Sequence, residues 1–310
     1  MRFTALIQVL CCTIALILSF LCLFAGHEKS FMEDYHLITL NTSLVGQTIL
    51  PTSSSPPSTN PLTNLLNLIP DPITDAINEQ IGNVAARLGI EDFYSAHLLT
   101  HCSGQYTPSE VPTSTISASQ ISKSVTSCSA PQALYTFDPT ALVEAALKQN
   151  TGLDVSLQDI RWPENIQSNI DALNTAMRAL FVLYVLAILF IFLALGTAVW
   201  SKMYAARWAV WTNICVVELA GLAVALASVL VTAVMVKTTG IVNRLGNDVG
   251  IEAYAGRKFL GLTWASTALM VVVSVVLGVE WYVARRAKSK SVGVATQGEV
   301  RGEKRRKFWL

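Results

Sequence analysis

Residues 179–200 read ALFVLYVLAILFIFLALGTAVW and contain no charged side chain. About 20 apolar residues in an α-helix cross the hydrocarbon core of a bilayer, which is roughly 30 Å thick. A helix of this length in a soluble protein normally keeps a polar face. The segment therefore predicts a transmembrane helix.

Three more apolar runs of similar length occur at 3–26, 209–236 and 260–283. The chain of 310 residues is 52% hydrophobic and 14% charged, whereas a soluble domain has about 25% charged residues. We therefore expect an all-α membrane protein built on a bundle of four transmembrane helices. The first run could instead be a signal peptide cleaved near Ala25. Its apolar stretch exceeds the usual signal-peptide core, so we expect it to be retained, and the alternative stays open.

Lysine and arginine residues predict the direction of the four helices, because they concentrate on the cytosolic side. The connection 201–208 holds one lysine and one arginine, and the tail 284–310 holds nine basic and two acidic residues. Both segments, together with the N-terminus, are expected in the cytosol. The segment 27–178, with 15 acidic and six basic residues, is expected outside the cell. The loop 237–259 is also expected outside, although it carries four basic residues.

The outer segment shows one linker and three helical patterns. Residues 50–64 are rich in serine, threonine and proline and are expected to be extended. Apolar residues recur at helical spacing in 73–88, in 138–152, and from Trp162 into the second apolar run. We therefore expect a mainly helical extracellular domain whose last helix continues into the membrane.

Asn41 begins the tripeptide Asn41-Thr42-Ser43, an N-glycosylation sequon. Such tripeptides occur by chance, but this one lies in the segment expected outside the cell. Asn41 is therefore a candidate glycosylation site.

Cys102 and Cys128 are the two of the six cysteines that lie outside the apolar runs. An isolated pair in an oxidising compartment is expected to form a disulfide. Closing the loop between them would stabilise the fold by roughly 3 kcal/mol in the chain-entropy model. His97 and His101 are near in sequence, but no orienting Asn or Asp is evident for a catalytic Cys–His pair. We therefore predict a structural disulfide that closes the outer loop.

Four short blocks surround this cysteine pair, and they read DFYSAHLL at 92–99, CSG at 102–104, TSCS at 126–129 and FDP at 137–139. In these blocks, and in the order of one span, a long outer loop and three further spans, the chain resembles the fungal cortical-patch (eisosome) tetraspan and PalI family. The family is distantly similar to claudins. The Trp and Gly-Leu-Trp residues of the claudin signature are absent before the cysteine pair, so claudin-like strand assembly is not expected.

The resemblance implies a multi-pass plasma-membrane protein of fungal cortical domains, which helps to organise membrane compartments, the cell wall or endocytosis. The PalI branch of the family serves ambient-pH signalling and typically has a long hydrophilic cytosolic tail. Only 27 residues follow the fourth apolar run here. We therefore treat pH signalling as the alternative.

Glu218 is the one acidic residue deep within an apolar run. Polar residues in a membrane core are costly and are functional candidates by default. Helical spacing aligns Glu218 with small residues of the third run, and Ser274 of the fourth run is expected at a similar depth. We expect a hydrogen bond across the bundle, with an ion or proton pathway as the alternative.

The sequence contains no P-loop, metal-ligand spacing, nucleophile motif or basic nucleic-acid-binding face. We therefore expect no enzyme activity, no cofactor, no metal and no nucleic-acid partner. The favoured function is organisation of cortical membrane domains, and the alternatives are PalI-like pH signalling and a channel or transporter. The expected partners are the bilayer, anionic inner-leaflet lipids near the basic tail, and other cortical membrane proteins or the cell wall. Self-association into a homo-oligomer is left open.

Overall fold

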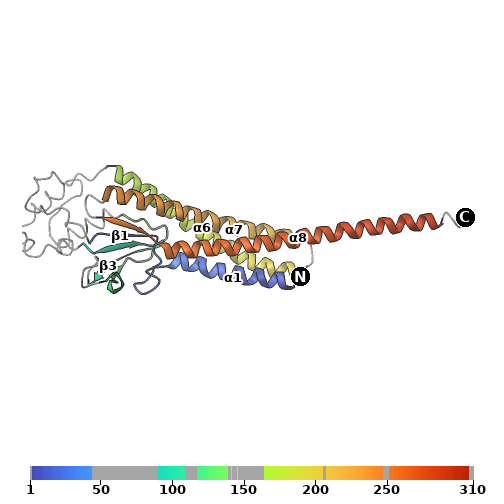
Figure 1. The fold of residues 1–310 in the computed structure, drawn as a ribbon, viewed down its shortest axis with the longest axis horizontal. Helices are drawn as coiled ribbons and strands as arrows, with labels where there is room; N and C mark the ends of the chain where they lie inside the picture. Colours follow the sequence, from blue (N-terminus) through green and yellow to red (C-terminus); the bar gives the residue numbers. More distant parts are fainter. Residues whose placement is uncertain are drawn as a thin grey trace, which may run out of the picture. The chain divides into compact units, whose positions relative to one another are not determined.

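Four long helices dominate the structure, a computed structural model. The residues it describes are 2–43, 90–108, 117–138, 141, 145, 164–204, 207–246 and 251–306. The helices, shown in Figure 1, are α1 (Arg2–Phe24), α6 (Glu164–Met203), α7 (Arg207–Gly246) and α8 (Arg257–Arg306). All four are long and apolar enough to cross a membrane, by length and composition. The prediction of four membrane helices is therefore confirmed.

Three of the helices extend well beyond the predicted spans. α6 begins at Glu164 and runs without interruption into its apolar part, as predicted. α7 continues past residue 236 to Gly246, so part of the predicted loop 237–259 is helical instead. That stretch contains no proline, which is the residue most able to end a helix. α8 likewise continues past residue 283 to Arg306.

The chain divides into two compact units, and each of the four helices contributes to both. The first unit comprises residues 1–17, 186–224 and 265–310. The second unit comprises residues 18–185 and 225–264.

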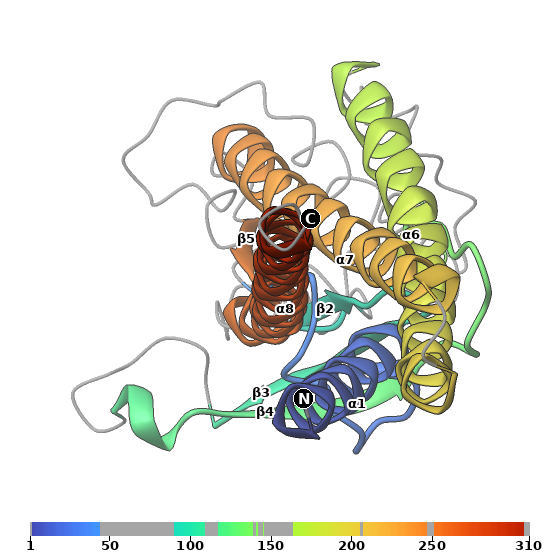
Figure 2. The same cartoon turned by 90° about the vertical axis from the view of Figure 1, so that its right-hand side faces the viewer.

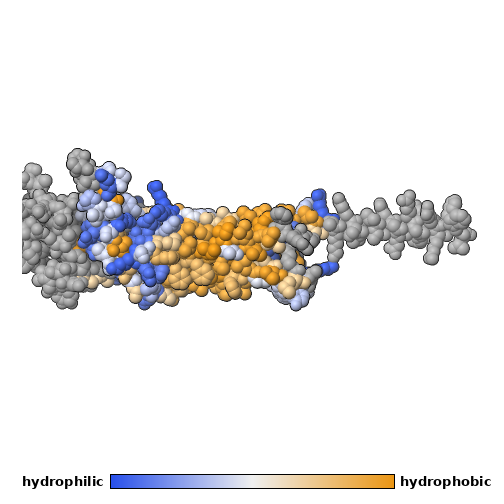
Figure 3. Space-filling view, turned by 90° about the horizontal axis from the view of Figure 1, so that it is seen from below, coloured by the Kyte–Doolittle hydropathy of each residue, from blue (hydrophilic) through white to orange (hydrophobic). Residues whose placement is uncertain are grey.

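The core of the first unit is made of small and apolar side chains from all four helices. Figure 2 draws the ribbons of these helices viewed roughly end-on. The fully buried members of the core recur at steps of three and four residues, for example Ala187, Ile191 and Ala194 on α6. Small side chains at this spacing let membrane helices approach closely. The outer faces stay apolar, as Phe192 (64% exposed) illustrates, and hydrophobic residues cover the middle of the helix region in Figure 3. An apolar outer surface is what a helix needs where lipid replaces water.

The second unit contains a five-stranded antiparallel sheet of order β4-β3-β2-β1-β5. Its strands are β1 (Ile38–Asn41), β2 (Phe93–Ala96), β3 (His101–Thr107), β4 (Ser122–Cys128) and β5 (Glu252–Ala255). The prediction of an all-α protein with a mainly helical outer domain is therefore wrong for these segments. The helical patterns predicted at 73–88 and 138–152 and the linker at 50–64 fall almost wholly outside the described residues.

β1 is the strand that joins the two predicted outer loops. It pairs with β2 on one side and with β5 on the other, so that Ile38 lies opposite both Ala96 and Ala255. β5 belongs to the second of these loops, predicted at 237–259. The two loops therefore form one sheet through backbone hydrogen bonds.

The predicted disulfide is present between β3 and β4, where Cys102 lies directly opposite Cys128. The ladder is irregular between Ser103 and Gly104, the next residues along β3. A Cβ atom on Gly104 would lie 2.1 Å from the carbonyl oxygen of Ser124. Glycine is therefore required for the two strands to pair this closely beside the disulfide.

Candidate functional site

The C-terminal end of α1 is the point where the helix meets the sheet of the second unit. The helix ends at Phe24, and Gly26 follows with φ of +73°. This left-handed conformation ends many helices and favours glycine, which has no Cβ. A Cβ at this position would lie 2.3 Å from the ring of His97. Gly26 is therefore required both by its backbone angle and by the imidazole packed against it.

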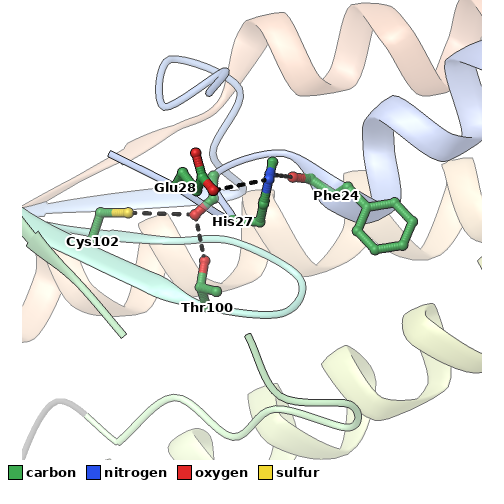
Figure 4. A network of polar contacts seen from close by, with 6 residues as sticks. Phe24, His27, Glu28, Thr100 and Cys102 are labelled. Atoms are coloured by element: carbon green, nitrogen blue, oxygen red, sulfur yellow. Dashed lines mark hydrogen bonds and ion pairs between the residues drawn. The ribbon is translucent and has the colours of Figure 1, made fainter. Parts of the chain in front are cut away.

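The carbonyl oxygen of Gly26 is the centre of a polar network, shown in Figure 4. Thr100 donates its hydroxyl to this oxygen at 2.8 Å, and the disulfide sulfur of Cys102 lies 3.6 Å from it. His27 contacts the carbonyl oxygen of Phe24 through Nδ1 at 3.1 Å. The helix end, the β2–β3 turn and the disulfide are thus held together at one buried oxygen.

Two histidines with uncharged rings lie beside this network. His97 is fully buried, and neither of its ring nitrogens has a hydrogen-bond partner among the described residues. Burial, together with the nearby His36, lowers the pKa of His97 to about 3. Burial and the charge of Lys123 lower the pKa of His36 to about 4. The two rings are 6.3 Å apart, and both are neutral at ordinary pH.

Glu33 carries the buried carboxyl group of this region. It is 9% exposed and accepts a hydrogen bond of 3.0 Å from the hydroxyl of Ser95, the residue opposite Cys102 in the sheet. Within the described residues, no group of three His, Cys, Asp or Glu side chains could hold a metal ion. The arrangement is that of a rigid structural junction, in which polar groups are buried and the cysteine is oxidised.

Several contacts fasten the loops of the second unit to the helices and to the sheet. Asp34 forms an ion pair with Lys258 in the first turn of α8, and this contact lowers the pKa of Asp34. The backbone N–H of Phe137 donates to the side-chain oxygen of Asn174 on α6 at 2.8 Å. Lys29 donates to the carbonyl oxygen of Thr126 on β4. The exposed Asp34–Lys258 pair contributes little stability by itself, so the burial of the sheet is the larger effect.

A cluster of side-chain amides joins three helices inside the first unit. Gln8 on α1 and Asn213 on α7 exchange two hydrogen bonds, of 2.9 and 3.3 Å, and Thr197 on α6 donates to Asn213 at 3.0 Å. Gln8 and Asn213 are almost fully buried. They are also the only amide side chains within the four apolar runs of the sequence. That rarity was the signal that could have identified them before the structure was known.

A hydroxyl cluster joins α6, α7 and α8 within the second unit. Tyr184 donates to the hydroxyl of Thr263 at 2.7 Å, and Ser228 lies 2.8 Å from the same hydroxyl. All three residues are fully buried. Like the amides, these hydroxyl groups form hydrogen bonds with one another where water is absent, as polar side chains between membrane helices commonly do.

Glu218 does not lie among these buried polar groups. It is on the exposed face of α7, whereas its neighbours Val217 and Ala220 face the core. Ser274 is half-buried, and its hydroxyl lies 4.0 Å from the position of a Cβ on Gly221. The close approach of small residues between α7 and α8 is therefore present, but Glu218 does not take part in it. The exposed position of Glu218 does not support the expected hydrogen bond across the bundle.

Asn41, the predicted glycosylation site, is the last residue of β1 and is only 1% exposed. Its side-chain oxygen accepts hydrogen bonds from the N–H and the hydroxyl of Ser43. Its Nδ2 atom is buried and has no partner among the described residues. Because Nδ2 is the atom that would carry a glycan, this burial argues against modification of the folded chain. The candidate glycosylation site is otherwise untested.

Four helices able to cross a membrane, together with a disulfide-joined sheet built from both connecting loops, define a four-span membrane protein. The chain belongs to the SUR7/PalI family, whose model matches residues 4–276. The predicted resemblance is therefore confirmed.

The chain is similar to the SUR7 family protein pun1 of Schizosaccharomyces pombe (strain 972 / ATCC 24843). It is 24% identical to this chain over 209 residues, which cover 63% of this chain and 65% of the relative. The match thus spans slightly less than two-thirds of the relative's length. No solved structure matches the chain.

Proposed function

We propose that this chain is a non-enzymatic plasma-membrane protein that organises cortical membrane domains in a fungal cell. The observation that carries the proposal is the family match, because residues 4–276 include α6, α7, the whole sheet, nearly all of α1 and the first part of α8. In this proposal the helix bundle anchors a rigid sheet, and the sheet meets neighbouring proteins or the cell wall.

The proposed orientation places the sheet outside and both termini in the cytosol. The Cys102–Cys128 disulfide supports it, because such bonds persist in oxidising compartments. Near the expected cytosolic end of α8, Arg285 lies 4.0 Å from the centre of the Trp281 ring. Aromatic and basic side chains of this kind are typical of a membrane interface.

The proposed partners follow from the two ends of the molecule. The basic residues after Trp281 would attract anionic lipids of the inner leaflet. On the other side, β4 is an edge strand whose serine and threonine side chains are largely exposed. Such an edge offers hydroxyl and backbone hydrogen bonds to a neighbouring protein or to wall polysaccharide.

PalI-like pH signalling is the alternative within the same family. The buried histidines give it little support, because pKa values of about 3 and about 4 keep His97 and His36 neutral at neutral and alkaline pH. A channel or transporter is supported still less. The buried amides and hydroxyls of the helices bind one another and leave no evident chain of free groups along the bundle within the described residues.

The proposal is tested by imaging a C-terminal fluorescent fusion of the full chain in living fungal cells. Stable cortical patches are the expected result. A Cys102→Ser variant should be retained in the endoplasmic reticulum, whereas the matched Cys215→Ser variant, which changes a free exposed cysteine, should behave like the parent. A uniform or internal signal for the parent would contradict the proposal. Deletion of this chain that abolishes growth at alkaline pH, but leaves the cortical patches of other proteins in place, would favour the signalling alternative.

A further inference from the structure

Glu218 lies on an apolar outer surface, deep within the membrane span. The Gln8–Asn213 hydrogen bonds place these two residues at the same depth. Gln8 is four residues from Thr4, where the first span begins, which is about 6 Å at 1.5 Å per residue. Glu218 is five residues further along α7 than Asn213, and therefore about 14 Å inside the span. A carboxyl group facing lipid at this depth is costly, so it needs a hydrogen-bonding partner.

The exposed face of α7 around Glu218 forms a regular row, which we name the α7 seam. Its residues recur at steps of four, three and four and are Trp211, Cys215, Glu218 and Leu222. At about 100° per residue the seam lies on the side of α7 opposite Asn213 and Val217, which face the core. The α7 seam therefore faces away from the rest of its own unit.

α1 carries a second exposed row with the same spacing, which we name the α1 seam. Its residues are Leu6, Leu10, Thr13 and Ile17. This row also lies opposite the buried face of its helix, which carries Gln8 and Cys12. Both seams thus point outward and are free to contact another chain.

The two seams match in depth, residue by residue. α1 and α7 are the first and third of four successive spans, so they cross the membrane in the same direction. Gln8 and Asn213 are 205 positions apart, and the same offset relates each member of the α1 seam to one member of the α7 seam. By this offset Thr13 lies at the same depth as Glu218. Thr13 carries the hydroxyl group of the α1 seam, and Glu218 carries the carboxyl group of the α7 seam.

We propose that the α1 seam of one copy of this chain packs along the α7 seam of the next copy, with the hydroxyl of Thr13 hydrogen-bonded to Glu218. Two copies in one membrane share their orientation, so every residue keeps its depth and the seams meet in register. Parallel helices with exposed rows at steps of three and four pack at a shallow crossing angle. The Thr13 hydroxyl donates to the carbonyl oxygen of Val9 at 2.7 Å, and threonine in a helix can exchange such a bond by changing its χ1 rotamer.

This contact is head to tail, because each copy offers one α1 seam and one α7 seam. Such heterologous contacts form rings or open rows rather than a closed pair. A row of this kind would give the proposed cortical organiser a means of lateral assembly. The contact itself rests on the two seams and does not depend on the proposed function.

Cys215 supplies a reporter for the contact, because it is exposed while Cys11, Cys12 and Cys22 are buried. Leu10 is the α1-seam residue at the depth of Cys215. The full chain carrying Leu10→Cys is oxidised with copper phenanthroline in native membranes and separated on a non-reducing gel. A ladder of dimers, trimers and larger species is expected, and it should collapse on reduction. The parent chain and the Leu10→Cys, Cys215→Ser chain should both stay monomeric.

Leu193→Cys is the matched control, because Leu193 is exposed on α6 near the same depth. It should give no ladder. A single dimer band from the parent through Cys215 alone would overturn the proposal in favour of a two-fold α7 contact. Adducts of another mass that need Cys215 but not Leu10→Cys would overturn it in favour of a different partner protein. The absence of any crosslink in the Leu10→Cys chain would also overturn it.

The hydrogen bond is tested in the Leu10→Cys background. Thr13→Val and Glu218→Leu should each lower the initial rate of crosslinking about threefold, the effect of an average intramembrane hydrogen bond. The two together should lower it no further, and Glu218→Gln should retain it. Unequal effects of the two single substitutions would exclude the Thr13–Glu218 pair. Crosslinking is measured in whichever membrane contains the protein, so its failure is distinct from a failure of cortical localisation.

Discussion

Gln8 and Asn213 are 205 positions apart, yet they exchange two side-chain hydrogen bonds of 2.9 and 3.3 Å. Each amide supplies the donor and the acceptor that the other needs inside the membrane. Thr197 adds a third helix to the pair. α1 is therefore an integral part of the helix bundle, although its sequence is also compatible with a cleaved signal peptide.

Removing one member of this pair should destabilise the bundle. Gln8→Leu leaves the Asn213 side chain buried with one partner fewer, at a cost of about 1–2 kcal/mol. The measurement is the fraction of detergent-solubilised protein that stays monodisperse after heating. Ile14→Val, which changes an exposed side chain on the same helix outside the α1 seam, should leave the midpoint unchanged. A Gln8→Leu chain as stable as the parent would contradict the role of the pair.

The same pair predicts that α1 stays attached to the mature protein. A cut near Ala25 would remove Gln8 and leave Asn213 without its amide partner. A small epitope placed before Arg2 should therefore remain on the full-length band in purified plasma membranes. Loss of the epitope with a matching decrease in mass would show cleavage and would contradict the prediction.

The spans and the disulfide could be predicted from the sequence because each depends on local or compositional features. Length and hydropathy identify a span, and an isolated pair such as Cys102 and Cys128 identifies a bridge. The sheet left no such signal. β1 reads ITLN and β2 reads FYSA, and all eight residues are buried, so neither strand shows the alternation of a half-buried strand. β1 also pairs with β5, more than 200 residues away, and nothing local indicates that pairing.

The direction of Glu218 could not be predicted for a related reason. Small or apolar residues surround it on every side of α7, so spacing alone does not say which face packs on the other helices. The contacts of Asn213 with Gln8 and Thr197 settle the rotation of the helix. They turn Val217 and Ala220 inward and Glu218 outward. The two amide residues can be recognised in the sequence, but their hydrogen bonds depend on how three helices pack, which the sequence does not show locally.

Gly26→Ala should destabilise the second unit by at least about 2 kcal/mol, because the new Cβ adds strain at positive φ and meets the His97 ring at 2.3 Å. Gly261→Ala is the matched control, since a Cβ at Gly261 in α8 meets nothing within 4 Å. There alanine should be neutral or mildly stabilising. Thermal midpoints of the three purified proteins decide the comparison. Equal midpoints for the two variants would contradict the close packing of the helix end on His97.

Acid should destabilise the second unit through its buried histidines. The folded pKa values of His97 (about 3) and His36 (about 4) lie below the unfolded value of about 6.5. Between pH 6.5 and 4 the unfolded chain therefore binds protons that the folded chain does not. Stability is full above about pH 6.5, and it should fall by up to about 1.4 kcal/mol per pH unit for each histidine.

The measurement is the thermal midpoint in detergent at several pH values from 7.5 to 4.5. His97→Gln should reduce the slope, because the proton of His97 is no longer taken up on unfolding. Cys215→Ser, a change far from titrating histidines in sequence, should leave the slope as in the parent. A midpoint that does not change over this range would contradict the burial of both imidazoles.

Asn41 should remain unmodified, because the nitrogen that would carry a glycan is buried, on the strand that lies between β2 and β5 in the sheet. A glycan attached before folding would have to be accommodated inside the sheet, so such chains should fail to mature. We expect no shift of the mature parent chain on treatment with an N-glycosidase. Gln120→Asn provides the control, since it creates the sequon Asn-Ile-Ser at an exposed position. That variant should carry a glycan if the segment faces the lumen, and its band should shift on treatment. A glycan on Asn41 would contradict the burial of β1, whereas an unmodified Gln120→Asn chain would contradict the proposed outside location of the sheet.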